Sequence, residues 1–141
     1  MQPKPTHLGP HYAQQFCDLS VAESYRARPP YPEETFDILA KLLPKGHSRN
    51  ILELGCGSGD LTVGLITLAD RIDAVDISQP LLEIARSRLA KDIEKVHWFN
   101  QPAETFDSDM RYALVCAGAS LHWMGWERLF PKLQSLLIPI G

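Results

Sequence analysis

The sequence predicts an α/β fold built on a doubly wound parallel sheet, and two observations support this prediction. Short apolar runs alternate with amphipathic stretches along the chain, as strands and crossover helices do around a parallel sheet. The apolar run 51–54 also leads directly into Gly55, Gly57 and Gly59, after which a helical pattern begins. A strand, a glycine-rich turn and a helix start are typical of a nucleotide-type pocket at the carboxyl end of such a sheet.

The individual elements follow from hydrophobic periodicity and from helix start and stop signals. Residues 1–32 hold six of the eleven prolines and predict an amino-terminal arm, with the main domain covering 33–141. Strands are expected at 51–54, 72–76, 96–99 and 112–116. Helices are expected at 33–43, 60–69, from a Ser78 cap to Leu89, and at 126–138.

Two of these helices have a feature that predicts a structural detail, namely an apolar stripe in one and an internal proline in the other. The helix at 33–43 presents an apolar stripe made of Phe36, Leu39, Leu42 and Leu43. The last helix contains Pro131, whose ring and missing N–H predict either a distortion or a start beyond that residue.

The composition is that of one domain with a hydrophobic core, and it excludes several partners. The 141 residues are 45% hydrophobic and 22% charged, with a formal net charge of −3. This charge gives no basic footprint for nucleic acid or anionic membrane, and no apolar run reaches the ~18 residues that span a bilayer. The three cysteines have no metal-ligand spacing, so no metal is expected, and a reducing cytoplasm is the simplest location.

The spacing of the glycines discriminates between possible ligands. A dinucleotide-binding turn would place its third glycine at position 60, where this chain has Asp60, and the Gly-Lys-Ser/Thr of a phosphate-binding loop is absent. An acid, Glu53, lies two residues before the first glycine. Another acid, Asp76, ends the next apolar run about twenty residues later, where a carboxylate can accept hydrogen bonds from ribose hydroxyls.

These residues resemble the motifs of a known family. The E-x-G-x-G-x-G string from Glu53 and the V-D-x-S string at 75–78 are similar to those of class I S-adenosylmethionine-dependent methyltransferases. The resemblance extends from about residue 25 to the end of the chain. It implies a Rossmann-like sheet, seven-stranded in the family, of which four strands are recognisable here in the order 3-2-1-4. It also implies S-adenosylmethionine as the cofactor, whose ammonium and sulfonium favour a carboxylate at the turn.

Three further segments resemble one part of this family, the type 11 methyltransferase subfamily. They are 25–32, which is similar to its Y-R-x-x-R-P-x-Y-P arm, the P-A-E at 102–104, and 117–123, which is similar to its A-x-x-L-H-W segment. The resemblance implies that Arg28, or else Arg26, pairs with the cofactor carboxylate and that the P-A-E segment lies at the adenine. The cofactor-binding residues so predicted are Arg28, Glu53, Gly55, Cys56, Gly57, Gly59, Asp76, Ile77, Ala103, Glu104 and Ser120. His122 is the candidate general base, or alternatively a structural histidine beside a helix start.

The leading functional prediction is methyl transfer from S-adenosylmethionine to a small-molecule acceptor, with no nucleic-acid or membrane partner. One alternative is a catalytically silent fragment or isoform that acts through a protein partner, because the family's last strands are missing. A second alternative is a nicotinamide-dependent dehydrogenase, against which the glycine spacing argues. We expect the uncovered edge of the strand at 112–116 to favour self-association.

Overall fold

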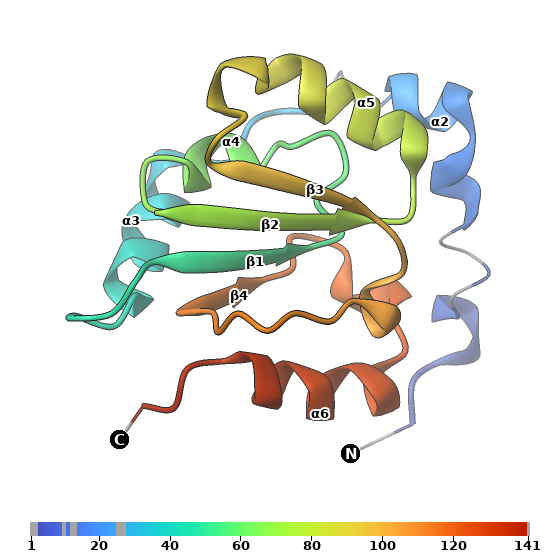
Figure 1. Cartoon of the computed structure of the whole chain (residues 1–141). Helices are drawn as coiled ribbons and strands as arrows, with labels where there is room; N and C mark the ends of the chain where they lie inside the picture. Colours follow the sequence, from blue (N-terminus) through green and yellow to red (C-terminus); the bar gives the residue numbers. More distant parts are fainter. Residues whose placement is uncertain (1–2, 10, 12–13, 25–27, 141) are drawn as a thin grey trace.

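The computed structural model describes residues 3–9, 11, 14–24 and 28–140 and contains a four-stranded parallel sheet (Figure 1). The strands are β1 (Asn50–Leu54), β2 (Arg71–Asp76), β3 (Val96–Asn100) and β4 (Leu114–Cys116). Their order is β3-β2-β1-β4, and each neighbouring pair is parallel. The predicted α/β class and strand order are confirmed.

Helices cover both faces of this sheet, as Figure 1 shows. The α-helices are α2 (Leu19–Ser24), α3 (Glu33–Leu42), α4 (Thr62–Leu65), α5 (Gln79–Arg88) and α6 (Trp126–Leu136). Short 3₁₀ turns are η1 (Thr6–Leu8), η2 (Gln14–Cys17), η4 (Ala90–Asp92), η5 (Ala103–Thr105) and η6 (Leu121–Trp123). Ser78 caps α5 as predicted, because its Oγ accepts a hydrogen bond from the Leu81 amide at 3.3 Å.

The core consists of two clusters, one on each face of the sheet. Side chains alternate along β1, so Ile51 belongs to the cluster under α3, α4 and α5, while Leu52 and Leu54 belong to the cluster against α6. The second cluster also contains Phe106 and Leu129. Both faces of β1 are therefore buried, as the apolar run at 51–54 predicted.

Three helix predictions need correction. The expected helix at 60–69 is helical only over α4, because the Thr67 hydroxyl donates to the Gly64 carbonyl at 3.0 Å and the last turn tightens. Leu42, at which α3 ends, is 60% exposed, whereas Phe36, Leu39 and Leu43 of the predicted stripe pack against the core. The last helix begins at Trp126, so Pro131 does not delay its start.

The fourth strand is shorter than predicted. The amide of Ala113 still bonds to the Asn50 carbonyl of β1, at 2.8 Å. Tyr112, however, pairs with the segment that follows α6 through an isolated parallel bridge to Leu137. Its amide bonds to the Leu136 carbonyl at 2.9 Å, and its carbonyl accepts from the Ile138 amide at 3.0 Å. The edge of this region is therefore partly occupied at Tyr112, which corrects the expectation of a fully uncovered edge.

The amino-terminal arm lies across the carboxyl end of the sheet, beside α5 (Figure 1). The Ser78 hydroxyl donates to the carbonyl of Phe16, and the thiol of Cys17 donates to the Ile77 carbonyl at 3.5 Å. Phe16 also meets Trp123 edge-on, with ring centroids 5.9 Å apart. These contacts place the arm residues of η2 beside the loops that follow β2 and β4.

The described part of the chain lacks two features that would indicate other kinds of protein. None of its helices has the length and apolar character needed to cross a membrane. It likewise contains no group of three or more His, Cys, Asp or Glu side chains arranged to hold a metal ion.

Candidate functional site

A cavity opens at the carboxyl ends of the strands, where ligands bind in open parallel sheets. Each strand contributes the loop that follows it, and the arm closes one side. The lining consists of Gln14, Phe16, Arg28, Tyr31, Glu53, Gly55, Cys56, Gly57, Ser58, Asp60, Leu61, Val75, Asp76, Ile77, Leu81, Gln101, Pro102, Ala103, Glu104, Gly118, Ala119, Ser120, Trp123 and Met124.

The glycine loop, residues 55–59, forms the floor of the cavity. Gly55, Gly57 and Gly59 all have positive φ, at 67°, 54° and 87°, a left-handed conformation that glycine adopts without a Cβ penalty. The amides of Gly55 and Cys56 both donate to the Val75 carbonyl, at 2.8 and 3.1 Å. The loop thus bends over the end of β2 and exposes its backbone to the cavity.

Asp76, at the end of β2, holds the glycine loop from one side. Its carboxylate accepts hydrogen bonds from the Gly57 amide at 2.8 Å and from the Ser78 amide at 2.7 Å. Its side chain lines the cavity although the residue is only 8% exposed. Burial raises the pKa of this carboxyl, and the hydrogen bonds from the backbone amides oppose that rise.

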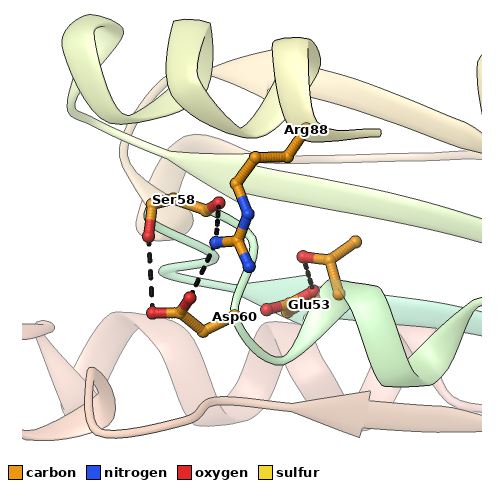
Figure 2. A network of polar contacts seen from close by, with 5 residues as sticks. Glu53, Ser58, Asp60 and Arg88 are labelled. Atoms are coloured by element: carbon orange, nitrogen blue, oxygen red, sulfur yellow. Dashed lines mark hydrogen bonds and ion pairs between the residues drawn. The ribbon is translucent and has the colours of Figure 1, made fainter. Parts of the chain in front are cut away.

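Glu53 is the most deeply buried acid of the cavity wall, at 1% exposure. Its carboxyl accepts a hydrogen bond from the Thr62 hydroxyl of α4 at 2.6 Å (Figure 2). Burial raises the pKa of Glu53 to about 8, the Thr62 hydrogen bond lowers it, and the neighbouring Asp76 and Asp60 raise it further. A cation in the cavity would reverse this effect and favour the carboxylate.

A polar network joins the glycine loop to α5, as Figure 2 shows. The Arg88 guanidinium donates through Nη1 to the Ser58 carbonyl at 2.9 Å and to the Asp60 carboxylate at 2.7 Å. The Ser58 hydroxyl lies 3.4 Å from the other Asp60 oxygen. Ser58 and Asp60 line the cavity, whereas Arg88 does not.

The loops after β3 and β4 form the opposite wall. The Glu104 carboxylate accepts from the Gly125 amide at 2.5 Å, just before α6 begins. The Ser120 hydroxyl donates to the Leu54 carbonyl at 2.7 Å, which joins the loop after β4 to the end of β1. Ala119, beside it, has a φ of 53°, a left-handed conformation that is unusual for a residue with a Cβ.

The structure brings most of the predicted site residues together. Ten of them line the cavity, namely Arg28, Glu53, Gly55, Cys56, Gly57, Asp76, Ile77, Ala103, Glu104 and Ser120. Gly59 lies outside the lining and packs against α5 instead. His122 also lies outside it, with its ring 4.6 Å from that of Trp123, which takes the position at the cavity. Arg26, the alternative to Arg28, lies outside the described residues.

Sequence reasoning missed the contribution of the arm and of the polar network. Gln14 and Phe16 line the cavity although the arm has no periodic pattern that would place them. Tyr31 lies within the arm motif that pointed to Arg28, so the same motif could have indicated it. The sequence identifies Asp60 only as the residue that breaks the dinucleotide spacing. No sequence pattern indicates its contact with Arg88.

The charges around the cavity favour a cationic ligand. Four acidic side chains line it, from Glu53, Asp60, Asp76 and Glu104, and Arg28 is the cationic residue of the lining. A ligand that carries positive charge at one end would balance these carboxylates. Arg28, at the mouth, offers a fork of donors suited to a carboxylate on the same ligand.

Comparison with known proteins gives one family match and several relatives. Residues 51–141 match a family model described as a methyltransferase domain. The chain is 28% identical over 127 residues to a protein of Saccharomyces cerevisiae named "Probable S-adenosylmethionine-dependent methyltransferase", covering 85% of this chain and 42% of that one. It is 33% identical over 115 residues to trans-aconitate 2-methyltransferase of Delftia acidovorans, covering 74% and 40%.

A solved methyltransferase structure is also similar to this chain. The S-adenosylmethionine-dependent methyltransferase from Thiobacillus denitrificans, in complex with S-adenosyl-L-homocysteine, superposes with a TM-score of 0.65 at 25% identity, covering 86% of this chain and 51% of that one. The present chain spans about two fifths of the length of the two curated relatives, at 42% and 40%.

Proposed function

The chain belongs to the methyltransferase domain family, and we propose that it binds S-adenosylmethionine in the cavity and directs its methyl group to a small-molecule acceptor. Family membership favours this function over a nicotinamide-dependent dehydrogenase. One observation carries the proposal: the glycine loop, Glu53 and Asp76 line a single cavity at the carboxyl ends of β1 and β2.

The residues present fit this cofactor. Asp76 is suited to accept hydrogen bonds from the ribose hydroxyls, because its carboxylate lines the cavity and keeps acceptor capacity beyond its bonds to the Gly57 and Ser78 amides. Glu53 supplies a buried carboxylate to a cationic group, and Arg28 can pair with the cofactor's own carboxylate. The segment around Ala103 and Glu104 forms the wall at which the adenine would lie.

When bound, the cofactor supplies an electrophilic methyl group on a sulfonium. The contribution of the chain is alignment and exclusion of water, because methyl transfer depends mainly on the approach of donor and acceptor in line. Phe16 and Trp123 pack edge to face at the cavity and are suited to exclude water from it. The role of His122 as general base stays a prediction, since His122 is not among the residues that line the cavity.

The acceptor is proposed to be a small molecule. Trans-aconitate 2-methyltransferase of Delftia acidovorans, whose name specifies such an acceptor, aligns with 74% of this chain. We further propose that the chain works in the cytoplasm, where Cys17, Cys56 and Cys116 remain free thiols.

We also propose that isolated chains self-associate through β4. This strand pairs with β1 along one edge, and in the described part of the chain no strand pairs with its other edge, since the Tyr112–Leu137 bridge lies two residues before it. Unpaired edge groups of this kind can pair with a second chain. Sedimentation at several concentrations tests this, and a concentration-independent monomer would contradict it.

Titration calorimetry tests the cofactor. We expect saturable binding of S-adenosylhomocysteine and none of NAD at the same concentration. Transfer of labelled methyl from S-adenosylmethionine to a panel of small carboxylic acids, amines and phenols would then identify the acceptor. Binding of NAD without binding of S-adenosylhomocysteine would refute the proposal.

A further inference from the structure

Arg88 contacts two residues of the cavity without reaching the cavity itself. It is the last residue of α5, and its side chain is 41% exposed. Its Nη1 atom donates to the Ser58 carbonyl and to the Asp60 carboxylate, and both acceptor residues line the cavity (Figure 2). We propose that Arg88 is a positioning residue that holds the glycine loop in its ligand-binding conformation; this inference rests on the proposed function.

The packing of α5 shows why a polar contact is needed here. A Cβ on Gly59 would lie 3.3 Å from the Cβ of Ala85 and 3.4 Å from the Cδ1 of Leu89, so α5 and its C-cap residue pack closely against the loop. This apolar contact sets the distance between helix and loop, but it does not satisfy the polar groups of the loop. The carbonyl of Ser58, a residue only 2% exposed, receives its hydrogen bond from Arg88.

The second contact of Arg88, with the Asp60 carboxylate, orients the Asp60 side chain. Arg88 forms an ion pair with this carboxylate, whose side chain is 22% exposed. The pair draws the Asp60 side chain toward α5. Loss of Arg88 would remove the ion pair of this carboxylate and would release the turn that joins Gly59 to α4.

Arg88 and Asp76 therefore hold the loop from two directions. Asp76 bonds to the Gly57 amide from β2, and Arg88 bonds to the next residue's carbonyl from α5. Because ligand binding at such a loop depends on backbone placement to within a fraction of an ångström, removing one of the two contacts should weaken binding.

The test uses the full chain with Arg88→Met, Arg88→Lys and the matched control Arg86→Met. Arg86 lies on the same helix and is exposed, and its charge acts on the Cys56 thiol of the loop. In the described structure it makes no hydrogen bond to the loop, so this control separates the loss of a nearby charge from the loss of the two contacts. Three quantities are compared with the unsubstituted chain: affinity for S-adenosylhomocysteine, the thermal midpoint without ligand, and hydrogen exchange of the 55–60 amides without ligand.

We expect Arg88→Met to weaken S-adenosylhomocysteine binding about fivefold, the scale of a partly exposed charged contact, and to speed exchange in the loop. Arg86→Met should change neither quantity. Arg88→Lys should recover most of the affinity, because both contacts come from one nitrogen and a lysine ammonium also donates more than one hydrogen bond.

The outcomes separate this inference from the proposed function. Unchanged affinity and unchanged loop exchange in Arg88→Met would overturn the positioning role while leaving cofactor binding intact. A lower thermal midpoint with unchanged affinity would likewise overturn it, since Arg88 would then be structural only. If the unsubstituted chain fails to bind S-adenosylhomocysteine, the proposed function is refuted. The positioning role of Arg88 can still be tested in that case, because unchanged hydrogen exchange of the loop amides in Arg88→Met would refute it.

Discussion

Gly55 and Ser120 lie so close together that Gly55 has no room for a side chain. A Cβ on Gly55 would be 2.4 Å from the Cβ of Ser120 and 2.6 Å from its Oγ. Ser120 is held there by its hydrogen bond to the Leu54 carbonyl, across 66 positions of sequence. The loop after β4 therefore presses against the glycine loop, and this contact forms one corner of the cavity.

Replacing Gly55 by alanine should destabilise the fold by about 3 kcal/mol, because the left-handed backbone penalty adds to the collision with Ser120. Gly46→Ala is the matched control: its φ is 80°, but nothing lies within 4 Å of the added Cβ. We expect that change to cost only about 1 kcal/mol. Urea unfolding of both variants measures the difference, and equal losses would show that the contact with Ser120 relaxes.

Asp76→Ala should weaken binding of S-adenosylhomocysteine by about 2 kcal/mol, or roughly thirtyfold. The change removes a carboxylate from the cavity and frees the Gly57 amide that it holds. Asp37→Ala, on the exposed face of α3, is the control and should leave the affinity unchanged. Calorimetry decides the point: full affinity in Asp76→Ala would remove this residue from the site.

Glu53 should make the stability of the unliganded chain depend on pH. Burial raises its pKa from 4.5 to about 8, so between these values the folded state binds more protons than the unfolded state. The contribution of protonated Glu53 to the unfolding free energy is complete below about pH 4.5 and is lost as the pH rises to about 8. Between these values the unfolding free energy falls by up to about 1.4 kcal/mol per pH unit.

The variant Glu53→Gln keeps an acceptor for the Thr62 hydroxyl but does not titrate. The unfolding free energy of the unsubstituted chain should therefore fall relative to that of Glu53→Gln between pH 5.5 and 8. Denaturant unfolding at four pH values measures both. Parallel profiles would mean that Glu53 does not hold its proton in the folded state.

Gly64→Ala should destabilise the chain by about 1 kcal/mol even though alanine favours helices. A Cβ at Gly64 would lie 2.1 Å from ring atoms of Phe36, so α3 must move away from α4. Adding Phe36→Leu should relieve the collision, and the double variant should be more stable than the sum of the single changes predicts. Affinity for S-adenosylhomocysteine should stay constant, since neither residue lines the cavity. Strictly additive losses of unfolding free energy in the double variant would contradict the collision between Gly64→Ala and Phe36.

The sequence by itself determined the features that depend on neighbours along the chain. The apolar run of β1 and the three glycines predicted the strand and the turn, because burial on both faces and positive φ restrict the residues that fit. The Ser78 cap followed in the same way from local backbone chemistry. The strand order, by contrast, came from the family resemblance, and the structure confirmed it.

Only the tertiary structure decided which distant residues complete the cavity. Phe16 reaches it because its carbonyl pairs with Ser78, 62 positions away, and Arg88 reaches the glycine loop across 30 positions. Likewise, Tyr112, which was predicted to begin the fourth strand, pairs instead with the segment after α6, 25 positions away. Such contacts depend on how packed helices and loops meet in space, and hydrophobic periodicity carries no information about them, since it reports only which face of an element is buried.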